Sequence, residues 1–171
     1  VATYGDNEAL VDVASGRRWT YAELDADVNA LSRGLIAAGI EVGDRVGVWS
    51  PNCAEWVIAQ FATAKIGAIL VNANPAYRTH EVEYVLNQAG ISVLFASLSH
   101  KTSDYRAMVE QVRGSCPKLR ETVYIGDPSW AALLARGTSD RREELAVRAG
   151  ELSCDDPINI QYTSGTTGFP K

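Results

Sequence analysis

The sequence predicts an α/β fold: a doubly wound, mainly parallel sheet flanked by helices and preceded by a short N-terminal β-hairpin. Three observations predict it. Short apolar runs alternate with amphipathic segments of helical period between residues 45 and 125. The links between them are short, and glycine or proline stands at the ends of the segments. The length of 171 residues, with 46% hydrophobic residues, suits one domain or most of one. Strand, helix and strand in close succession form βαβ units, whose strands are parallel.

The N-terminal hairpin is predicted from two short strands around a turn. Ala9–Val13 is rich in apolar residues, Ser15-Gly16 makes the turn, and Arg17–Thr20 returns. A hairpin of this length lies at an edge of the fold.

The first helix begins at Thr20. Glu23 stands three residues later, which is the spacing of a capping box. Gly39 ends the helix, as glycine does at a C′ position. The apolar side chains at helical spacing form a face that we expect to be core: Leu24, Val28, Leu31 and Leu35.

A βαβ unit follows. Arg45–Trp49 is a strand, Ser50-Pro51-Asn52 is expected to cap a helix over residues 54–66, and residues 68–71 form a continuous apolar strand. The helix is apolar almost all round, which predicts burial on more than one side. Its apolar residues are Trp56, Val57, Ile58, Phe61, Ala62 and Ala64.

The pattern then repeats. Residues 72–78 form a loop, Thr79 begins a helix that Gly90 ends, and residues 91–95 form a strand. Ser103-Asp104 caps a further helix through Val112, and residues 122–125 form the next strand. This repetition is typical of a doubly wound sheet.

The pattern weakens beyond residue 126. We expect a short helix over residues 130–135, a second helix over residues 141–148, and a strand over residues 158–162. The expected organisation is an N-terminal hairpin (1–20), a βα sub-domain (21–126), a connector (127–157), and a strand with a terminal loop (158–171).

Composition excludes several classes of function. The net charge is −5 and no run of lysine or arginine occurs, which argues against a nucleic-acid surface. Cys53, Cys116 and Cys154 are far apart, so neither a disulfide framework nor a zinc site is indicated. His80 and His100 are isolated. No apolar run reaches the ~18 residues of a transmembrane helix, and we expect a cytoplasmic protein.

The strongest candidate site is the terminal loop, Thr163–Lys171. Its glycines allow backbone N–H groups to approach an anion, its hydroxyl groups add donors, and Lys171 adds a positive charge. A Walker P-loop would need four residues between its two glycines, whereas two separate Gly165 from Gly168. The loop therefore predicts phosphate binding of a different type.

The ordered string Ser164–Lys171 resembles the phosphate-binding signature of the AMP-forming adenylate synthetases: acyl-CoA synthetases, peptide-synthetase adenylation domains and luciferases. It fills every position of the pattern [Ser/Thr]-Gly-[Ser/Thr]-Thr-Gly-x-Pro-Lys. Residues 43–56 and 64–68 also look like the N-terminal region of acyl-CoA synthetases. Residues 71–78 are similar to fatty acyl-CoA synthetases, most of all to the bacterial medium-chain members.

The resemblance implies a two-step reaction. A carboxylate attacks the α-phosphate of ATP to give an acyl-adenylate and pyrophosphate, and the thiol of coenzyme A then displaces AMP. It implies ATP, Mg²⁺, a fatty acid and coenzyme A as the cofactors and partners of the parent enzyme. It implies a Mg²⁺ contact at Ser164. The implied nucleotide-binding residues are Thr163, Ser164, Gly165, Thr166, Thr167, Gly168 and Lys171.

In that family the adenine pocket, most of the acyl tunnel and the mobile C-terminal lysine follow the glycine loop. We therefore expect an incomplete N-terminal sub-domain of a larger enzyme, inactive alone and without an assignable catalytic residue. Such a sheet should expose an edge, which favours homodimer formation or aggregation. Two alternatives stay open: an adenylation enzyme for an aryl or amino acid, and a non-catalytic phosphate-binding module.

Overall fold

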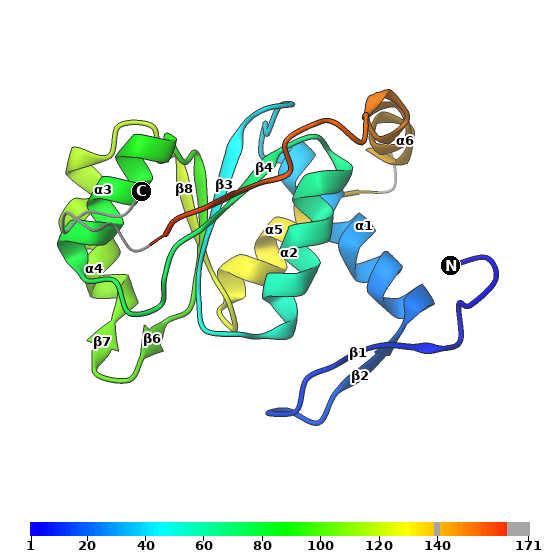
Figure 1. The fold of residues 1–171 in the computed structure, drawn as a ribbon, viewed down its shortest axis with the longest axis horizontal. Helices are drawn as coiled ribbons and strands as arrows, with labels where there is room; N and C mark the ends of the chain where they lie inside the picture. Colours follow the sequence, from blue (N-terminus) through cyan, green and yellow to red (C-terminus); the bar gives the residue numbers. More distant parts are fainter. Residues whose placement is uncertain (139–140, 164–171) are drawn as a thin grey trace.

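A parallel sheet of five strands forms the centre of the molecule, with helices on both sides (Figure 1). The structure is a computed structural model and describes residues 1–138 and 141–163. The strand order is β8-β5-β3-β4-β9, and every neighbouring pair is parallel. The strands are β3 (Arg45–Trp49), β4 (Ile69–Asn72), β5 (Val93–Ala96), β8 (Glu121–Tyr124) and β9 (Asn159–Gln161). The predicted fold class is confirmed.

Two helical layers cover the sheet. Figure 1 shows α1, α2 and α5 on one side and α3 and α4 on the other, which makes the sheet doubly wound. The helices are α1 (Tyr21–Ala37), α2 (Ala54–Lys65), α3 (Thr79–Ala89), α4 (Tyr105–Val112), α5 (Pro128–Arg136) and α6 (Arg142–Glu151), and a 3₁₀ turn covers Arg113–Ser115. Among the described residues, no helix combines the length and apolar character that a membrane span requires.

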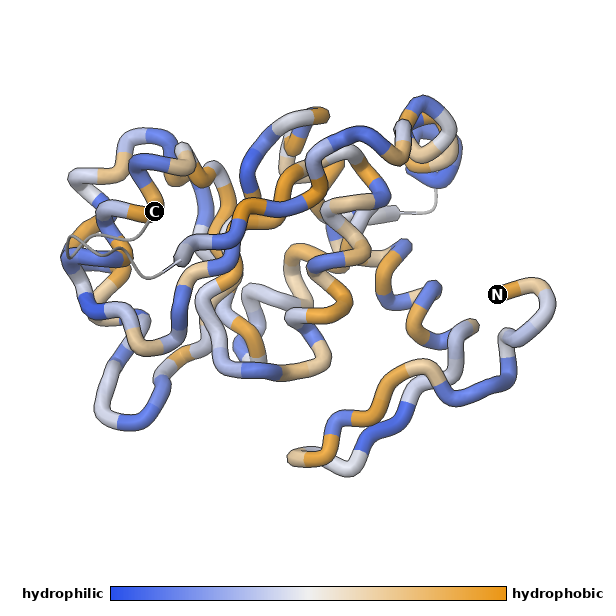
Figure 2. The backbone as a smooth tube through the Cα atoms, viewed as in Figure 1, coloured by the Kyte–Doolittle hydropathy of each residue, from blue (hydrophilic) through white to orange (hydrophobic). Residues whose placement is uncertain are grey.

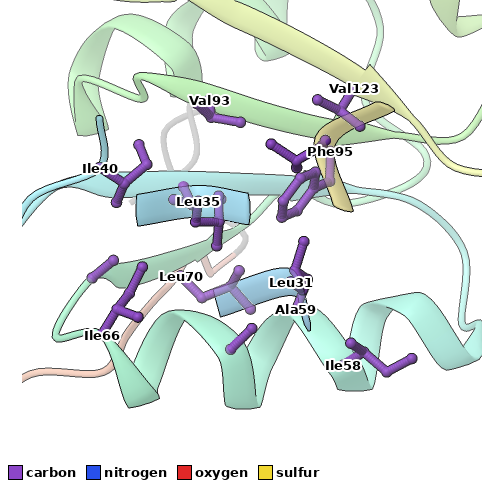
Figure 3. Packing of buried hydrophobic residues seen from close by; sticks show 14 of the residues in the cluster. Leu31, Leu35, Ile40, Ile58, Ala59, Ile66, Leu70, Val93, Phe95 and Val123 are labelled. Atoms are coloured by element: carbon purple, nitrogen blue, oxygen red, sulfur yellow. The ribbon is translucent and has the colours of Figure 1, made fainter. Parts of the chain in front are cut away.

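Alternation along the strands divides the core into two clusters. Val46 and Val48 of β3 face α1 and α2, whereas Trp49 faces α3 and α4. Figure 3 shows the first cluster, in which Leu31 of α1 and Phe95 of β5 pack between the helices and the sheet. Figure 2 shows hydrophobic stretches in the central strands and in the helices beside them. Both faces of the sheet are therefore buried, as continuous apolar strands predict.

The N-terminal predictions are confirmed. Strands β1 (Glu8–Val11) and β2 (Arg18–Thr20) form an antiparallel hairpin. Thr20 and Glu23 form the complete capping box of α1. Gly39 adopts a φ of +75° after the last turn, a conformation that favours glycine.

One prediction about α2 is wrong and one is confirmed. Its N-cap is Cys53, with no side-chain cap hydrogen bond, because Ser50 instead donates its hydroxyl to the carbonyl of Pro51 at 2.8 Å. Burial on more than one side is confirmed, since α1, α6 and the sheet all contact α2. Phe61 lies on the side that these neighbours leave open and is 52% exposed.

Other differences are short elements and boundaries. A small hairpin of β6 (Ser99–His100) and β7 (Ser103–Asp104) precedes α4 and was not predicted, because two-residue strands carry no periodic signal. The two helices expected after residue 126 are present as α5 and α6, and both pack on α1. The four-part organisation of the chain stays a prediction.

Gly34 of α1 marks a close approach to α5. A Cβ at Gly34 would lie 2.6 Å from the backbone oxygen of Leu133. We expect Gly34→Ala to lower the free energy of unfolding by about 1–3 kcal/mol, because a backbone atom cannot rotate away. Urea unfolding followed by circular dichroism measures this change in the free energy of unfolding. Gly150→Ala in α6 is the control, where the added methyl meets open space and should stabilise by up to about 1 kcal/mol. Equal changes in both variants would contradict this account.

Candidate functional site

The carboxyl ends of the parallel strands meet at one edge of the sheet, where ligands of doubly wound folds bind. Strand β9 pairs with β4, with Gln161 opposite Asn72. The chain therefore leaves β9 at this edge and passes the end of β4 as it reaches Thr163. The remaining predicted nucleotide-binding residues lie outside the described residues: Ser164, Gly165, Thr166, Thr167, Gly168 and Lys171. The structure thus describes the start of the predicted phosphate loop.

The loop of residues 73–78, which follows β4, is tied down by two buried aromatic residues. The indole N–H of Trp49 donates to the carbonyl of Asn74 at 3.1 Å, and the Tyr105 hydroxyl donates to the carbonyl of Pro75 at 2.5 Å. The two rings are stacked, with centroids 3.6 Å apart and planes at 7°. Both side chains are completely buried. The stack therefore joins the end of β3 and the start of α4 to this loop.

The same loop orients the helix that follows it. The Asn74 side chain accepts the N–H of Ala76 at 2.9 Å, which forms an Asx turn. Glu81 accepts the backbone N–H of Arg78 at 2.9 Å at the start of α3. The Arg78 guanidinium donates to the hydroxyl of Ser103 at 2.8 Å. Asn74-Pro75 is therefore part of a turn that orients α3.

Tyrosine side chains gather beside the end of β9. Burial raises the pKa of Tyr162, and the neighbouring Tyr84 and Tyr77 raise it further. Burial also raises the pKa of Tyr77, with a smaller contribution from Glu81. The phenols of Tyr162 and Tyr77 therefore stay protonated at neutral pH. They present uncharged donors and apolar ring surface next to the start of the predicted loop.

Asn72 is a residue of this edge that the sequence analysis did not single out. Its side-chain oxygen is buried and has no hydrogen-bond partner in the described part of the chain. A buried acceptor without a donor costs about 1–3 kcal/mol. A polar residue directly after the apolar run of residues 68–71 was the signal that could have found it.

A second polar contact joins the ends of β3 and β5. The hydroxyl oxygens of Ser50 and Ser97 are 2.7 Å apart, and the Cys53 sulfur lies 3.5 Å from the Ser50 oxygen. Burial raises the pKa of the Cys53 thiol, although its hydrogen bond with Ser50 opposes the rise. The thiol is therefore protonated and poorly suited to act as a nucleophile. No group of three potential metal ligands occurs among the residues described here.

Titration of the Tyr105 hydroxyl is expected to make the free energy of unfolding depend on pH. Burial raises its pKa to about 12, although Arg78 lowers it. The folded state therefore keeps a proton that the unfolded chain releases near pH 10. We expect the contribution of Tyr105 to stability to be complete below about pH 10 and to be lost as the pH rises towards 12. Urea unfolding between pH 9 and 12 tests this.

The matched variant for that measurement is Tyr105→Phe, which keeps the ring and removes the titrating hydroxyl. It should lose less stability over the interval than the unchanged protein. The other tyrosines with raised pKa values titrate in both proteins, so the difference isolates Tyr105. Identical losses in the two proteins would refute the assignment.

Comparison with known proteins gives the family. Residues 1–171 match the sequence profile of the family described as "AMP-binding enzyme". The chain belongs to this family. The resemblance inferred from the glycine-rich signature is confirmed, and the match extends over all the elements described above.

Two curated relatives illustrate the match. The chain is 40% identical to "Medium-chain acyl-CoA ligase ACSF2, mitochondrial" of Danio rerio, over 100% of this chain and 31% of that protein. It is 36% identical to "Putative acyl-CoA synthetase YngI" of Bacillus subtilis, over 98% of this chain and 34% of that protein. The chain therefore spans about a third of the length of the curated relatives that it matches.

A solved structure agrees with the fold. The inhibitor-bound N-terminal domain of FACL13 from Mycobacterium tuberculosis has a TM-score of 0.83 and 28% identity, over 99% of this chain and 40% of that chain. The sheet and both helical layers of this AMP-binding family member are thus shared with an N-terminal domain.

Proposed function

We propose that this chain contributes the N-terminal, phosphate-binding part of an ATP-dependent, AMP-forming fatty acid–CoA ligase. The observation that carries the proposal is the complete phosphate signature, Ser164–Lys171, placed directly after a strand whose carboxyl end lies at the ligand-binding edge of the sheet. The names of the two curated relatives, both acyl-CoA ligases or synthetases, support the same activity.

The proposed reaction has two steps. A carboxylate oxygen attacks the α-phosphorus of ATP, and pyrophosphate leaves. The thiol of coenzyme A then attacks the acyl carbon, and AMP leaves. Negative charge develops on the pyrophosphate in the first step, so donors around the β- and γ-phosphates lower its barrier. In this proposal residues 163–168 surround those phosphates and Lys171 contacts them.

Mg²⁺ would neutralise charge on the phosphates when bound. The described residues do not supply a cluster of acidic ligands for it, which fits a metal held largely by phosphate oxygens and water. Ser164 is the proposed protein contact, since the family signature that the chain resembles has a hydroxyl residue just before its first glycine. Its role stays a prediction.

A fatty acid is the proposed carboxylate. Residues 71–78 resemble fatty acyl-CoA synthetases, and the Danio rerio relative is named as a medium-chain ligase. A thioester-forming screen of octanoate, benzoate and amino acids distinguishes the carboxylate classes. Coenzyme A consumption with octanoate supports the proposal, and consumption with an aryl or amino acid alone would replace it.

The decisive experiment compares two proteins. The protein encoded by the longest open reading frame that contains this chain should release pyrophosphate when it is given ATP, Mg²⁺ and octanoate. Residues 1–171 alone should not. Activity of residues 1–171 alone would contradict the expected inactivity. Absence of release by the longer protein with every carboxylate tested would favour a non-catalytic phosphate-binding module.

Location and assembly belong to the same proposal. We keep the cytoplasm as the proposed location, and cell fractionation tests it against the mitochondrial location in the name of the Danio rerio relative. Light scattering tests the proposed homodimer. A monomer at every protein concentration would rule it out.

A further inference from the structure

Two hollows adjoin on the side of the sheet opposite α3 and α4, and they differ in character. The first, of about 440 Å³, lies between α1 and α2 and is mainly apolar. The second, of about 490 Å³, lies between α1, α2 and α6. Lys65 lines both, so the two meet at this side chain. Figure 1 shows α1 and α6 on the far side of the sheet from α3 and α4.

The first hollow presents apolar side chains to solvent. Leu24 and Val28 of α1 form one wall, and Phe61 and Ala64 of α2 form the other. Phe61 is 52% exposed, and Tyr21 at the rim is 46% exposed. Large exposed side chains that line one groove indicate a surface that gains free energy when it is covered.

The second hollow is cationic. Arg33, Lys65 and Arg142 line it from three different helices, and none of its described lining residues is acidic. Arg33 donates its Nε to the carbonyl of Gly137, and neither Arg33 nor Arg142 forms a salt bridge within the described part of the chain. The whole chain carries a net charge of −5. A local cationic hollow on an acidic protein favours an anion there.

Asp25 lines the first hollow, and it is the one acidic residue among the described residues that line either hollow. Its carboxylate accepts from Lys65 at 2.9 Å and from Asn29 at 2.9 Å. These bonds satisfy Asp25 and reduce the charge that Lys65 offers to a ligand. The two arginines therefore carry the positive charge available at the second hollow.

We propose that the joined hollows bind one fatty-acid anion of medium chain length, as a site separate from the proposed ATP site. The carboxylate lies between Arg33 and Arg142, and the alkyl chain passes Lys65 into the groove beside Phe61. Positive charge at one end and apolar side chains at the other together favour an amphipathic anion as the ligand. The volumes fall in the usual range of small-molecule sites, which favours a single molecule.

Binding of octanoate to the full chain, measured by isothermal titration calorimetry without ATP, tests the proposal. Octanol lacks the charge and acetate lacks the chain, so each should bind at least about tenfold more weakly. The double variant Arg33→Gln/Arg142→Gln should weaken octanoate binding at least about fivefold. Phe61→Ser, at an exposed position that leaves the core intact, should weaken octanoate and octanol alike.

The matched controls lie on the N-terminal hairpin. Arg17→Gln/Arg18→Gln removes the same charge, and Val13→Ser removes an apolar side chain that is 90% exposed. Both should leave octanoate binding unchanged. The proposal is overturned by an absence of saturable binding, by equal affinity for octanol, or by groove variants that behave like these controls. Because no ATP or turnover is involved, none of these results bears on the proposed ligase activity.

Discussion

Replacing Trp49 with alanine is expected to lower the free energy of unfolding by about 3–5 kcal/mol. The side chain is completely buried at the end of β3, so its removal leaves a cavity in the cluster that α3 and α4 cover. It also removes the ring stacked on Tyr105 and leaves the carbonyl of Asn74 without its donor. Urea unfolding of the chain, followed by circular dichroism, gives the value.

Trp49→Phe separates the contribution of the stacked ring from that of the indole hydrogen bond. It keeps an aromatic ring for the stack and removes the indole N–H, so the expected loss is smaller, about 1–3 kcal/mol for the unpaired carbonyl and reduced packing. This variant also gives a result if Trp49→Ala does not fold. A loss below 1 kcal/mol in Trp49→Ala would show that the stack does not hold the loop of residues 73–78.

Lys171→Ala is expected to slow adenylation by the protein that the longest reading frame containing this chain encodes. Loss of a charge-assisted contact to phosphate costs about 1.5–3 kcal/mol, which corresponds to a rate lower by about 10- to 150-fold. Gly165→Ala should also slow the step, because a Cβ would obstruct backbone approach to the phosphates. Exchange of labelled pyrophosphate into ATP with octanoate measures the adenylation step directly.

Lys118→Ala provides the control for charge, since Lys118 is an exposed lysine distant in sequence from the proposed loop. It should leave the exchange rate unchanged. If Lys171→Ala and Gly165→Ala both exchange pyrophosphate as fast as the unchanged protein, the role proposed for the signature is wrong.

Local signals in the sequence predicted most of the fold. Strand β3 was placed at its observed bounds, and the capping box of Thr20 and Glu23 located the start of α1, because each depends on residues close together in the chain. The order of the strands was not predicted. Pairing of β9 with β4 depends on contacts between residues 69–72 and residues 159–161, and no periodic pattern records them.

In the candidate site, too, features formed by neighbouring residues were predicted and features formed by distant residues were not. The glycine-rich signature was visible in consecutive residues, and the structure places Thr163, the residue just before it, at the carboxyl edge. The stack of Trp49 and Tyr105 was not predicted, because it joins residues far apart in the chain that both look like ordinary core. Phe61 shows the converse case, since an apolar residue on an apolar helix proved to be exposed.

The position of β9 has a consequence for the order in which the protein is assembled. During synthesis, β3, β4, β5 and β8 emerge with α1 to α4 before β9 exists. Their pairing closes shorter stretches of chain than the pairing of β9 with β4 does, and long closures are slow. We therefore expect the strand that leads into the proposed phosphate loop to be the last to join the sheet. A nascent chain would then acquire the proposed phosphate loop only after the framework that receives it has folded.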